Sequence, residues 1–199
     1  MGIQTAFPTY LYQAKLRSAT RLNLKLLNEI KHLSEEDQAG LHWSATRYSN
    51  GYTSYGSLNR LHQFSPTFAQ LANDLGPHVQ AYAHQLGLKR STKLTMTDCW
   101  ANVMTYGVHH GWHIHPQSVI SGTYYVQAPP LSAPIQFEDP RIERLMAAPV
   151  SERRQRQLWL ALPVRQGWLV LFESFLRHEV PINRAKTPRV SVSFNYSYF

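Results

Sequence analysis

The apolar residues of the first part of the chain recur at the spacing of two amphipathic helices. Leucine and isoleucine return every three or four positions over 22–33, and Ser18 stands where an N-cap would begin that helix. A second stripe covers positions 68–86 behind Ser65-Pro66, a capping serine followed by proline at the first helical position. Gly76-Pro77 lies inside this stripe, where it could kink or split the helix.

After about residue 88 the apolar residues form short runs or alternate with polar ones, as they do in strands. An earlier aromatic run contains Pro8, which favours an edge strand. The expected strands cover positions 7–12, 92–104, 118–127, 135–137, 158–162, 167–172 and 189–199. Helices followed by many short strands predict an α+β protein: a double-stranded β-helix (jelly-roll or cupin-like) barrel with N-terminal supporting helices.

A chain of 199 residues suits a single domain over 1–199, with a helical N-terminal support over 1–90 and a jelly-roll core over 91–199. Residues 42–60 look irregular and rich in tyrosine, serine and glycine. This segment is either a surface loop or a loop that faces substrate. Residues 139–157 are charged and turn-prone, and predict a short helix or a lid.

The composition limits the location and the partners. One cysteine, Cys99, excludes an internal disulfide, and the sequence has no apolar run near 18 residues and no signal-peptide pattern, so we expect a cytoplasmic protein without a membrane span. The net charge of +8 attracts anions in general, but the basic residues form no tract beyond 153–156, which argues against nucleic acid as the partner. We expect a small-molecule or peptide substrate, and exposed aromatic strands leave a homodimer open.

Four of the ten histidines lie between positions 109 and 115. His113 and His115 stand two residues apart in an extended segment, so their imidazoles share one face and form half of a metal site. His178 is the candidate third ligand. His109 and His110 point in opposite directions and are interpreted as loop or rim residues.

The alternation at the C-terminus directs Arg189 and Ser191 into the barrel if the apolar residues between and after them pack outward. A buried arginine needs an anionic partner, because an unpaired buried charge is very costly. A carboxylate co-substrate held by both side chains would meet that need. The alternative is a structural ion pair of Arg189 with Glu138 or Glu173.

The order of histidine, distal histidine and then Arg-x-Ser about ten residues later resembles the 2-oxoglutarate- and Fe(II)-dependent oxygenases. His113-Ile114-His115-Pro116, Ser121-Gly122-Thr123-Tyr124-Tyr125, the residues 191–195 and Gly51-Tyr52-Thr53-Ser54-Tyr55 look more specifically like a small bacterial and phage branch of them. The resemblance implies Fe(II) held by His113, His115 and His178, and 2-oxoglutarate held by Arg189, Ser191 and Asn102. It implies hydroxylation of an unidentified substrate with release of succinate and CO2. The tyrosine usual two residues after the asparagine is replaced by Met104.

One departure from the resemblance concerns His115, which stands where these oxygenases carry a carboxylate ligand. Glu138, Asp139 and Glu173 are the carboxylates that could still join the metal. Two alternatives therefore stay open: a three-histidine cupin dioxygenase that is independent of 2-oxoglutarate, and a non-enzymatic module stabilised by a metal such as zinc. Trp112 and Tyr124 would line the pocket or, as aromatics more often do, pack in the core.

Overall fold

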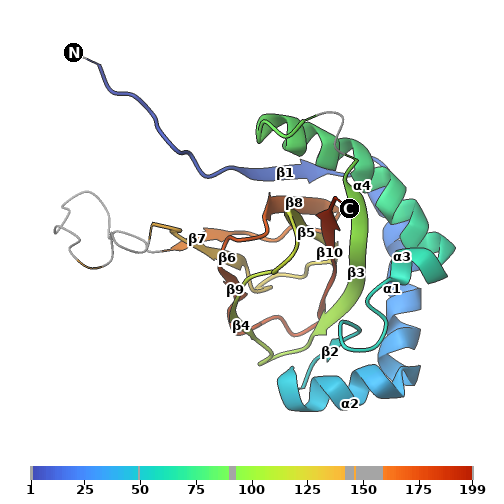
Figure 1. Cartoon of the computed structure of the whole chain (residues 1–199). Coiled ribbons are helices and arrows are strands. Elements are labelled where there is room, and N and C mark those ends of the chain that lie inside the picture. Colours follow the sequence, from blue (N-terminus) through green and yellow to red (C-terminus); the bar gives the residue numbers. More distant parts are fainter. Residues whose placement is uncertain (1, 49, 90–92, 142–145, 147–158, 199) are drawn as a thin grey trace.

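Two antiparallel sheets form the body of the protein in the computed structural model (Figure 1). The structure describes residues 2–48, 50–89, 93–141, 146 and 159–198. The larger sheet has the strand order β1-β8-β5-β10-β3-β2, and the smaller one has the order β4-β9-β6-β7. These sheets give the double-stranded β-helix that the sequence predicts.

The elements have the following bounds along the described chain. The helices are α1 (Ala19–Glu36), α2 (Gln38–Arg47), α3 (Leu61–Phe64) and α4 (Pro66–Gln85). The strands of the larger sheet are β1 (Leu11–Lys15), β2 (Tyr52–Thr53), β3 (Thr95–Met104), β5 (Ile120–Gln127), β8 (Trp168–Glu173) and β10 (Arg189–Ser197). Those of the smaller sheet are β4 (His110–His113), β6 (Ile135–Glu138), β7 (Trp159–Leu162) and β9 (His178–Val180).

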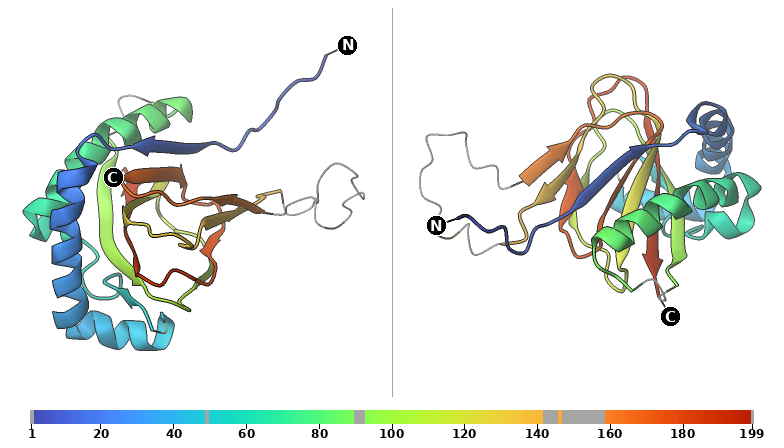
Figure 2. Two further views of the ribbon diagram at one scale, coloured as in Figure 1. Left: turned by 180° about the vertical axis from the view of Figure 1, so that it is seen from behind. Right: turned by 90° about the horizontal axis from the view of Figure 1, so that it is seen from above.

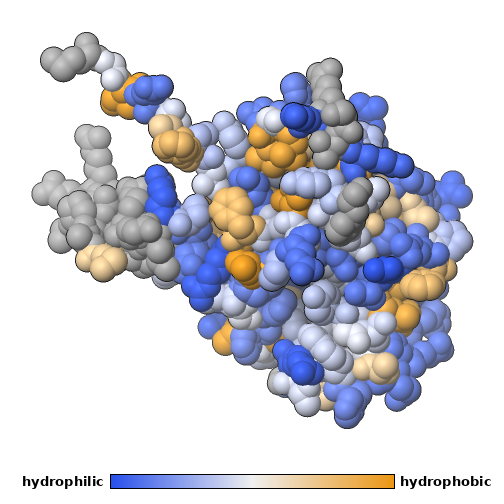
Figure 3. All heavy atoms as spheres, viewed as in Figure 1, coloured by the Kyte–Doolittle hydropathy of each residue, from blue (hydrophilic) through white to orange (hydrophobic). Residues whose placement is uncertain are grey.

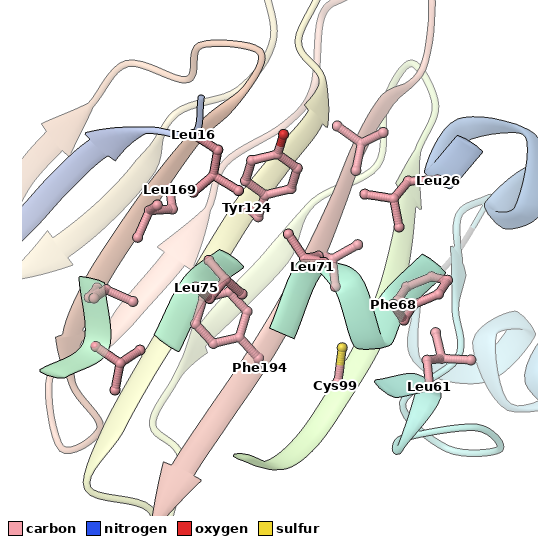
Figure 4. Close-up of a cluster of buried hydrophobic side chains, with 14 of the residues drawn as sticks. Leu16, Leu26, Leu61, Phe68, Leu71, Leu75, Cys99, Tyr124, Leu169 and Phe194 are labelled. Carbon is pink, nitrogen blue, oxygen red and sulfur yellow. The ribbon is translucent and has the colours of Figure 1, made fainter. Parts of the chain in front are cut away.

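The helices gather on the outer face of the larger sheet (Figures 1 and 2). The stripe on α4 is buried, with Phe68, Leu71 and Leu75 wholly inaccessible to solvent. These side chains pack against residues of β3, β5, β8 and β10 (Figure 4). Removing such side chains from water contributes about 1.5–3 kcal/mol each. The helical layer therefore fixes the larger sheet from outside and leaves its inner face free.

Strand β10 divides its residues between the two sides of the sheet. Its apolar residues, Val190, Val192, Phe194 and Tyr196, belong to the core under the helices. The alternating polar residues, from Arg189 to Asn195, face the interior of the barrel, where Arg189, Ser191 and Ser193 line one small pocket. The predicted alternation is confirmed, and a shift of one residue would have exchanged the two sets.

Two predicted boundaries are wrong. Residues 42–47 belong to α2, although 42–60 looked irregular. The end of α1 is followed at once by a new N-cap, because the Asp37 side chain accepts a hydrogen bond from Gly40 N at 3.0 Å. The first strand begins at Leu11 instead of residue 7, where Phe7 has a φ of 53° that no strand can hold.

Other expectations concern helix continuity and the 139–157 segment. Helix α4 runs unbroken through Gly76 and Pro77, and Ser65 caps it through Thr67 N and Phe68 N. Nearly all of 139–157, including the basic residues 153–156, lies outside the described residues. Among the helices of the described ranges, none has the length and hydropathy needed to cross a membrane. The face in Figure 3 is mostly hydrophilic, with small separate apolar patches.

Candidate metal centre and cleft

Three histidines meet between the two sheets. His113 ends β4 and is the register partner of His178, the first residue of β9. His115 follows two residues beyond the end of β4, and its backbone N–H donates to Ser174 O at 3.1 Å. One nitrogen from each of the three rings lies within 4.8 Å of the others. The structure thus brings together the three histidines that the sequence singled out.

Each of the three rings uses Nδ1 for a bond within the protein. Nδ1 of His113 lies 2.8 Å from Gly111 O, and Nδ1 of His178 lies 2.8 Å from Leu176 O. Nδ1 of His115 lies 2.7 Å from Asn195 Oδ1. Oxygens of this kind only accept, so each Nδ1 carries the proton and each Nε2 keeps its lone pair. A donor set of three imidazoles oriented in this way fits a divalent metal.

The charge state of the rings also suits metal binding. Burial, together with the neighbouring imidazoles His113 and His115, lowers the pKa of His178 to about 2. Burial likewise lowers the pKa of His115 to about 4, with His113 adding to the effect. The pKa of His113 is also lowered by burial. The three rings are neutral at pH 7 and need lose no proton to bind a cation.

Carboxylates are missing from this cluster over the ranges that the structure describes. Glu138 forms an ion pair with Arg177 at 2.8 Å. Asp139 forms one with Arg141 at 2.9 Å, and the pKa of Glu173 is raised by burial. None of the three candidates joins the histidines, so His115 stands alone in the place of the usual carboxylate.

Arg189 lines a small pocket together with the histidines and lacks an acidic partner among the described residues. Its side chain is 2% exposed, and Nη1 lies 3.3 Å from both Met104 Sδ and Ser191 Oγ. Its Nε is buried with no hydrogen-bond partner, and so is the hydroxyl of Tyr125, whose ring lies 5.1 Å from the guanidinium carbon. Buried polar atoms rarely stay unpaired, so this pocket has the chemistry of an anion site. The alternative pairing with Glu138 or Glu173 is not observed.

Asn102 and Ser191 face the same pocket as Arg189. Asn102 is 8% exposed and donates from Nδ2 to Ser193 Oγ at 3.2 Å. It also lines the large cleft beside the histidines. The three side chains predicted to hold a co-substrate are therefore together, and Asn102 lies between the anion pocket and the cleft.

The cleft has a volume of about 670 Å³ and contains His113 and His115 in its wall. Trp43, Tyr55 and Trp100 also line it, and they form a row of ring contacts with centroids 5.9 and 5.1 Å apart. Trp100 continues the row to His115 at 5.7 Å. Residues 48–56 are thus in part a cleft-facing segment.

Several residues of the site were missed by sequence reasoning. His110, interpreted as a loop or rim residue, is exposed at the start of β4 and lines the cleft, and its ring lies 4.0 Å from that of His113 and 5.5 Å from that of Tyr48. Tyr48 is 4% exposed and lines both cavities. Trp43 went unnoticed because α2 was not predicted. The tyrosine-rich composition was the one signal that pointed to this region.

Trp112 and Tyr124 are absent from the cleft lining among the described residues. Tyr124 is fully buried in the core under the helices and donates to Asn23 Oδ1 at 2.6 Å. Trp112 lies under the Arg177 guanidinium at 5.4 Å. Both aromatics have structural roles.

Comparisons with known proteins agree with this geometry. Residues 98–195 match the model of a family described as "Putative 2OG-Fe(II) oxygenase". No curated protein matches the chain. The fold superposes on HygX from Streptomyces hygroscopicus, crystallised with nickel and 2-oxoglutarate, with a TM-score of 0.66 and 13% identity over 96% of this chain and 83% of that one. It also superposes on a Pseudomonas putida prolyl-4-hydroxylase with a TM-score of 0.66 and 13% identity over 96% of this chain and 94% of that one. The epimerase SnoN from nogalamycin biosynthesis superposes with a TM-score of 0.65 and 14% identity over 96% of this chain and 79% of that one.

Identities this low establish the fold, and the family model adds the chemistry. Residues 98–195 thus match the family of 2-oxoglutarate- and Fe(II)-dependent oxygenases, and this match, together with the cluster of three histidines, indicates an oxidoreductase of the dioxygenase type whose cofactors are Fe(II) and 2-oxoglutarate.

Proposed function

We propose that His113, His115 and His178 hold Fe(II) through Nε2, and that Arg189 and Ser191 hold the distal carboxylate of 2-oxoglutarate with help from Asn102. An organic substrate in the cleft would then be hydroxylated. The observation that carries this assignment is the unpaired Nε of buried Arg189, which faces the same pocket as the histidines. A cation without a counter-ion is stable there only if a ligand supplies the negative charge.

The overall reaction takes substrate, 2-oxoglutarate and O2 to hydroxylated substrate, succinate and CO2. Bound iron with its keto-acid co-substrate supplies the oxidising chemistry. The protein's residues position the reactants: Arg189 fixes one end of the co-substrate through charge-assisted bonds. Trp100 and the ring row beside it keep the cleft wall near His115 apolar.

The substrate that suits the cleft is a small molecule or a short peptide. A volume of about 670 Å³ matches cavities that take ligands of drug size. The rings of Trp43 and Tyr55 offer flat contact area, and Arg47 lies over Trp43 at 5.1 Å. We keep nucleic acid as the less favoured partner, because the basic residues form no tract.

We also propose a cytoplasmic location and a homodimer. Cys99 is buried and free, which fits a reducing cytoplasm. Trp159 and Leu160 on the outer strand β7 are 44% and 49% exposed, and they support a homodimer as a proposal. Sedimentation of the purified protein tests it.

Anaerobic titration tests the main assignment. Fe(II) and 2-oxoglutarate added to the wild-type protein should give a visible metal-to-ligand band, and Arg189→Ala should need far more 2-oxoglutarate to reach it. A screen for compounds that stimulate succinate formation then finds the substrate. Absence of both the band and succinate with the wild-type protein would rule the assignment out.

A second candidate is a three-histidine dioxygenase that needs no 2-oxoglutarate. It is favoured by the lack of a carboxylate in the described part of the ligand cluster. Oxygen uptake with substrate alone, unaffected by Arg189→Ala, would be its signature. A purely structural metal is disfavoured, because such sites are closed by four protein ligands, whereas the described residues bring three together beside an open cleft.

A further inference from the structure

Asn195 connects His115 to a carboxylate outside the ligand cluster. Its Oδ1 accepts hydrogen bonds from His115 Nδ1 at 2.7 Å and from Ser121 Oγ at 2.8 Å. Its Nδ2 donates to Asp98 Oδ2 at 3.3 Å. Asp98 on β3 and Ser121 on β5 are the register partners of Asn195 on β10, so the pairing of three neighbouring strands positions these hydrogen-bonded side chains.

The negative charge of Asp98 has no cationic partner in the described part of the chain. Its carboxylate accepts from neutral donors: Thr97 Oγ1 at 2.7 Å, Asn59 Nδ2 at 3.5 Å and Asn195. Arg60 and Asp98 both line the large cleft, but Arg60 forms no ion pair with Asp98. The charge is therefore positioned by hydrogen bonds and is not neutralised by them.

The direction of the Asn195 amide follows from the chemistry of its neighbours. A carboxylate only accepts, so Nδ2 must face Asp98. Rotating the amide would bring Oδ1 against the carboxylate and would turn Nδ2 toward His115 and Ser121. Asp98 thus selects the amide orientation, the amide requires a proton on His115 Nδ1, and Nε2 is left for a metal.

The other two histidines have no such connection. Nδ1 of His113 and of His178 donates to a backbone carbonyl, Gly111 O and Leu176 O. Those hydrogen bonds orient the two rings, but their acceptors are neutral peptide groups. His115, which occupies the place of the usual carboxylate, is the ring that is linked to a carboxylate one amide away.

We propose that Asp98 supplies, through Asn195, the negative charge that the three-histidine ligand set lacks. It acts as a positioning residue that strengthens His115 as a donor and partly offsets the extra positive charge left on the metal. The inference rests on the proposed function, because it requires His115 to bind the metal.

Asp98→Asn tests the charge alone, since the new amide can still accept from Asn195. Calorimetric titration with Ni(II) should show binding about tenfold weaker or more, within the range found when outer partners of ligands are removed. The Fe(II)–2-oxoglutarate band should move to shorter wavelength, because a more positive metal gives up an electron less easily. Asp98→Glu should restore affinity in part. Asp74→Asn, the same change at an outer-helix carboxylate bonded to Ser18, should alter neither readout.

Two further variants keep the test decisive. Asn195→Ala removes the hydrogen bonds between Asp98 and His115 while leaving the charge of Asp98 in place. It should weaken Ni(II) binding about as much as Asp98→Asn does, and it replaces that variant in the test if Asp98→Asn does not fold. In a His115→Asp background, where the ligand itself is a carboxylate, Asp98→Asn should no longer weaken Ni(II) binding.

The outcomes separate this inference from the assignment beneath it. Wild-type protein that binds neither Ni(II) nor Fe(II) overturns both. Wild-type protein that binds metal, with Asp98→Asn equal to it in affinity and band position, overturns the role of Asp98 alone. An equal loss from Asp98→Asn in the His115→Asp background would also overturn it, since the effect would not pass through His115.

Discussion

The two faces of the larger sheet use the same strands for opposite purposes. Under the helices, each buried side chain shares its contacts with many neighbours, as Leu75 and Phe194 do. Inside the barrel, polar groups such as Arg189 Nε are buried and still unpaired. The side chains of the outer face are packed by the protein alone, whereas the buried polar groups of the inner face find all their partners only when a ligand is bound. Substitutions on the two faces should therefore separate stability from binding.

Removing a ligand should have the largest effect. His178→Ala should weaken Ni(II) binding by more than about 100-fold and abolish succinate formation, because loss of an outer partner alone costs 10–100-fold. Calorimetry measures the affinity, and His109→Ala on the exposed rim should bind as the wild type does. His178→Ala with unchanged affinity would contradict the three-histidine assignment.

Leu75→Ala examines the outer face. Loss of this fully buried side chain should lower the free energy of unfolding by about 2–5 kcal/mol. Urea denaturation measures the loss, and the KM for 2-oxoglutarate should stay constant at temperatures where the variant is folded. A large rise in that KM would show that the two faces are coupled more strongly than the packing indicates.

Arg189→Ala reverses the pattern on the inner face. The KM for 2-oxoglutarate should rise at least roughly 30-fold, the effect of losing 2 kcal/mol or more from a buried charged contact. The melting temperature of the metal-free protein should stay level or increase, because an unpaired buried cation is removed. Arg165→Ala, which removes a cation lying over Trp168 at 5.1 Å, is the matched control and should leave the KM unchanged. Unaltered 2-oxoglutarate dependence in Arg189→Ala would refute the co-substrate role.

Tyr124→Phe should have the smallest effect. It removes the hydroxyl that donates to Asn23, at a cost of about 1 kcal/mol in unfolding free energy. Thermal denaturation measures it. Steady-state constants should not move, and a change in them would mean that Tyr124 contributes to the pocket after all.

The sequence predicted those features that depend on local pattern. The α4 stripe, its serine cap and the two faces of β10 follow from spacing alone, and so did the inward direction of Arg189. Helix α2 was missed because Asp37 is both the C-cap of α1 and the N-cap of α2. The link from Asp98 to His115 could not be foreseen, because it depends on the register of β3, β5 and β10, which brings together residues 74 to 97 positions away from Asn195. The ring contacts of His110 could not be foreseen for a related reason: pairing with β9 determines its surroundings.

The anchoring of the three rings has a mechanical consequence. His113 and His178 belong to the smaller sheet, while His115 is held by Ser121 and Asn195 of the larger one. An ion bound to all three would act as a cross-brace between the layers. Its binding energy would add to the resistance of the barrel against opening, by an amount that grows with the logarithm of ion concentration. Amide exchange in β4 and β9 would then slow as metal is added. The ion that enables oxidation would therefore also stabilise the association of the two sheets.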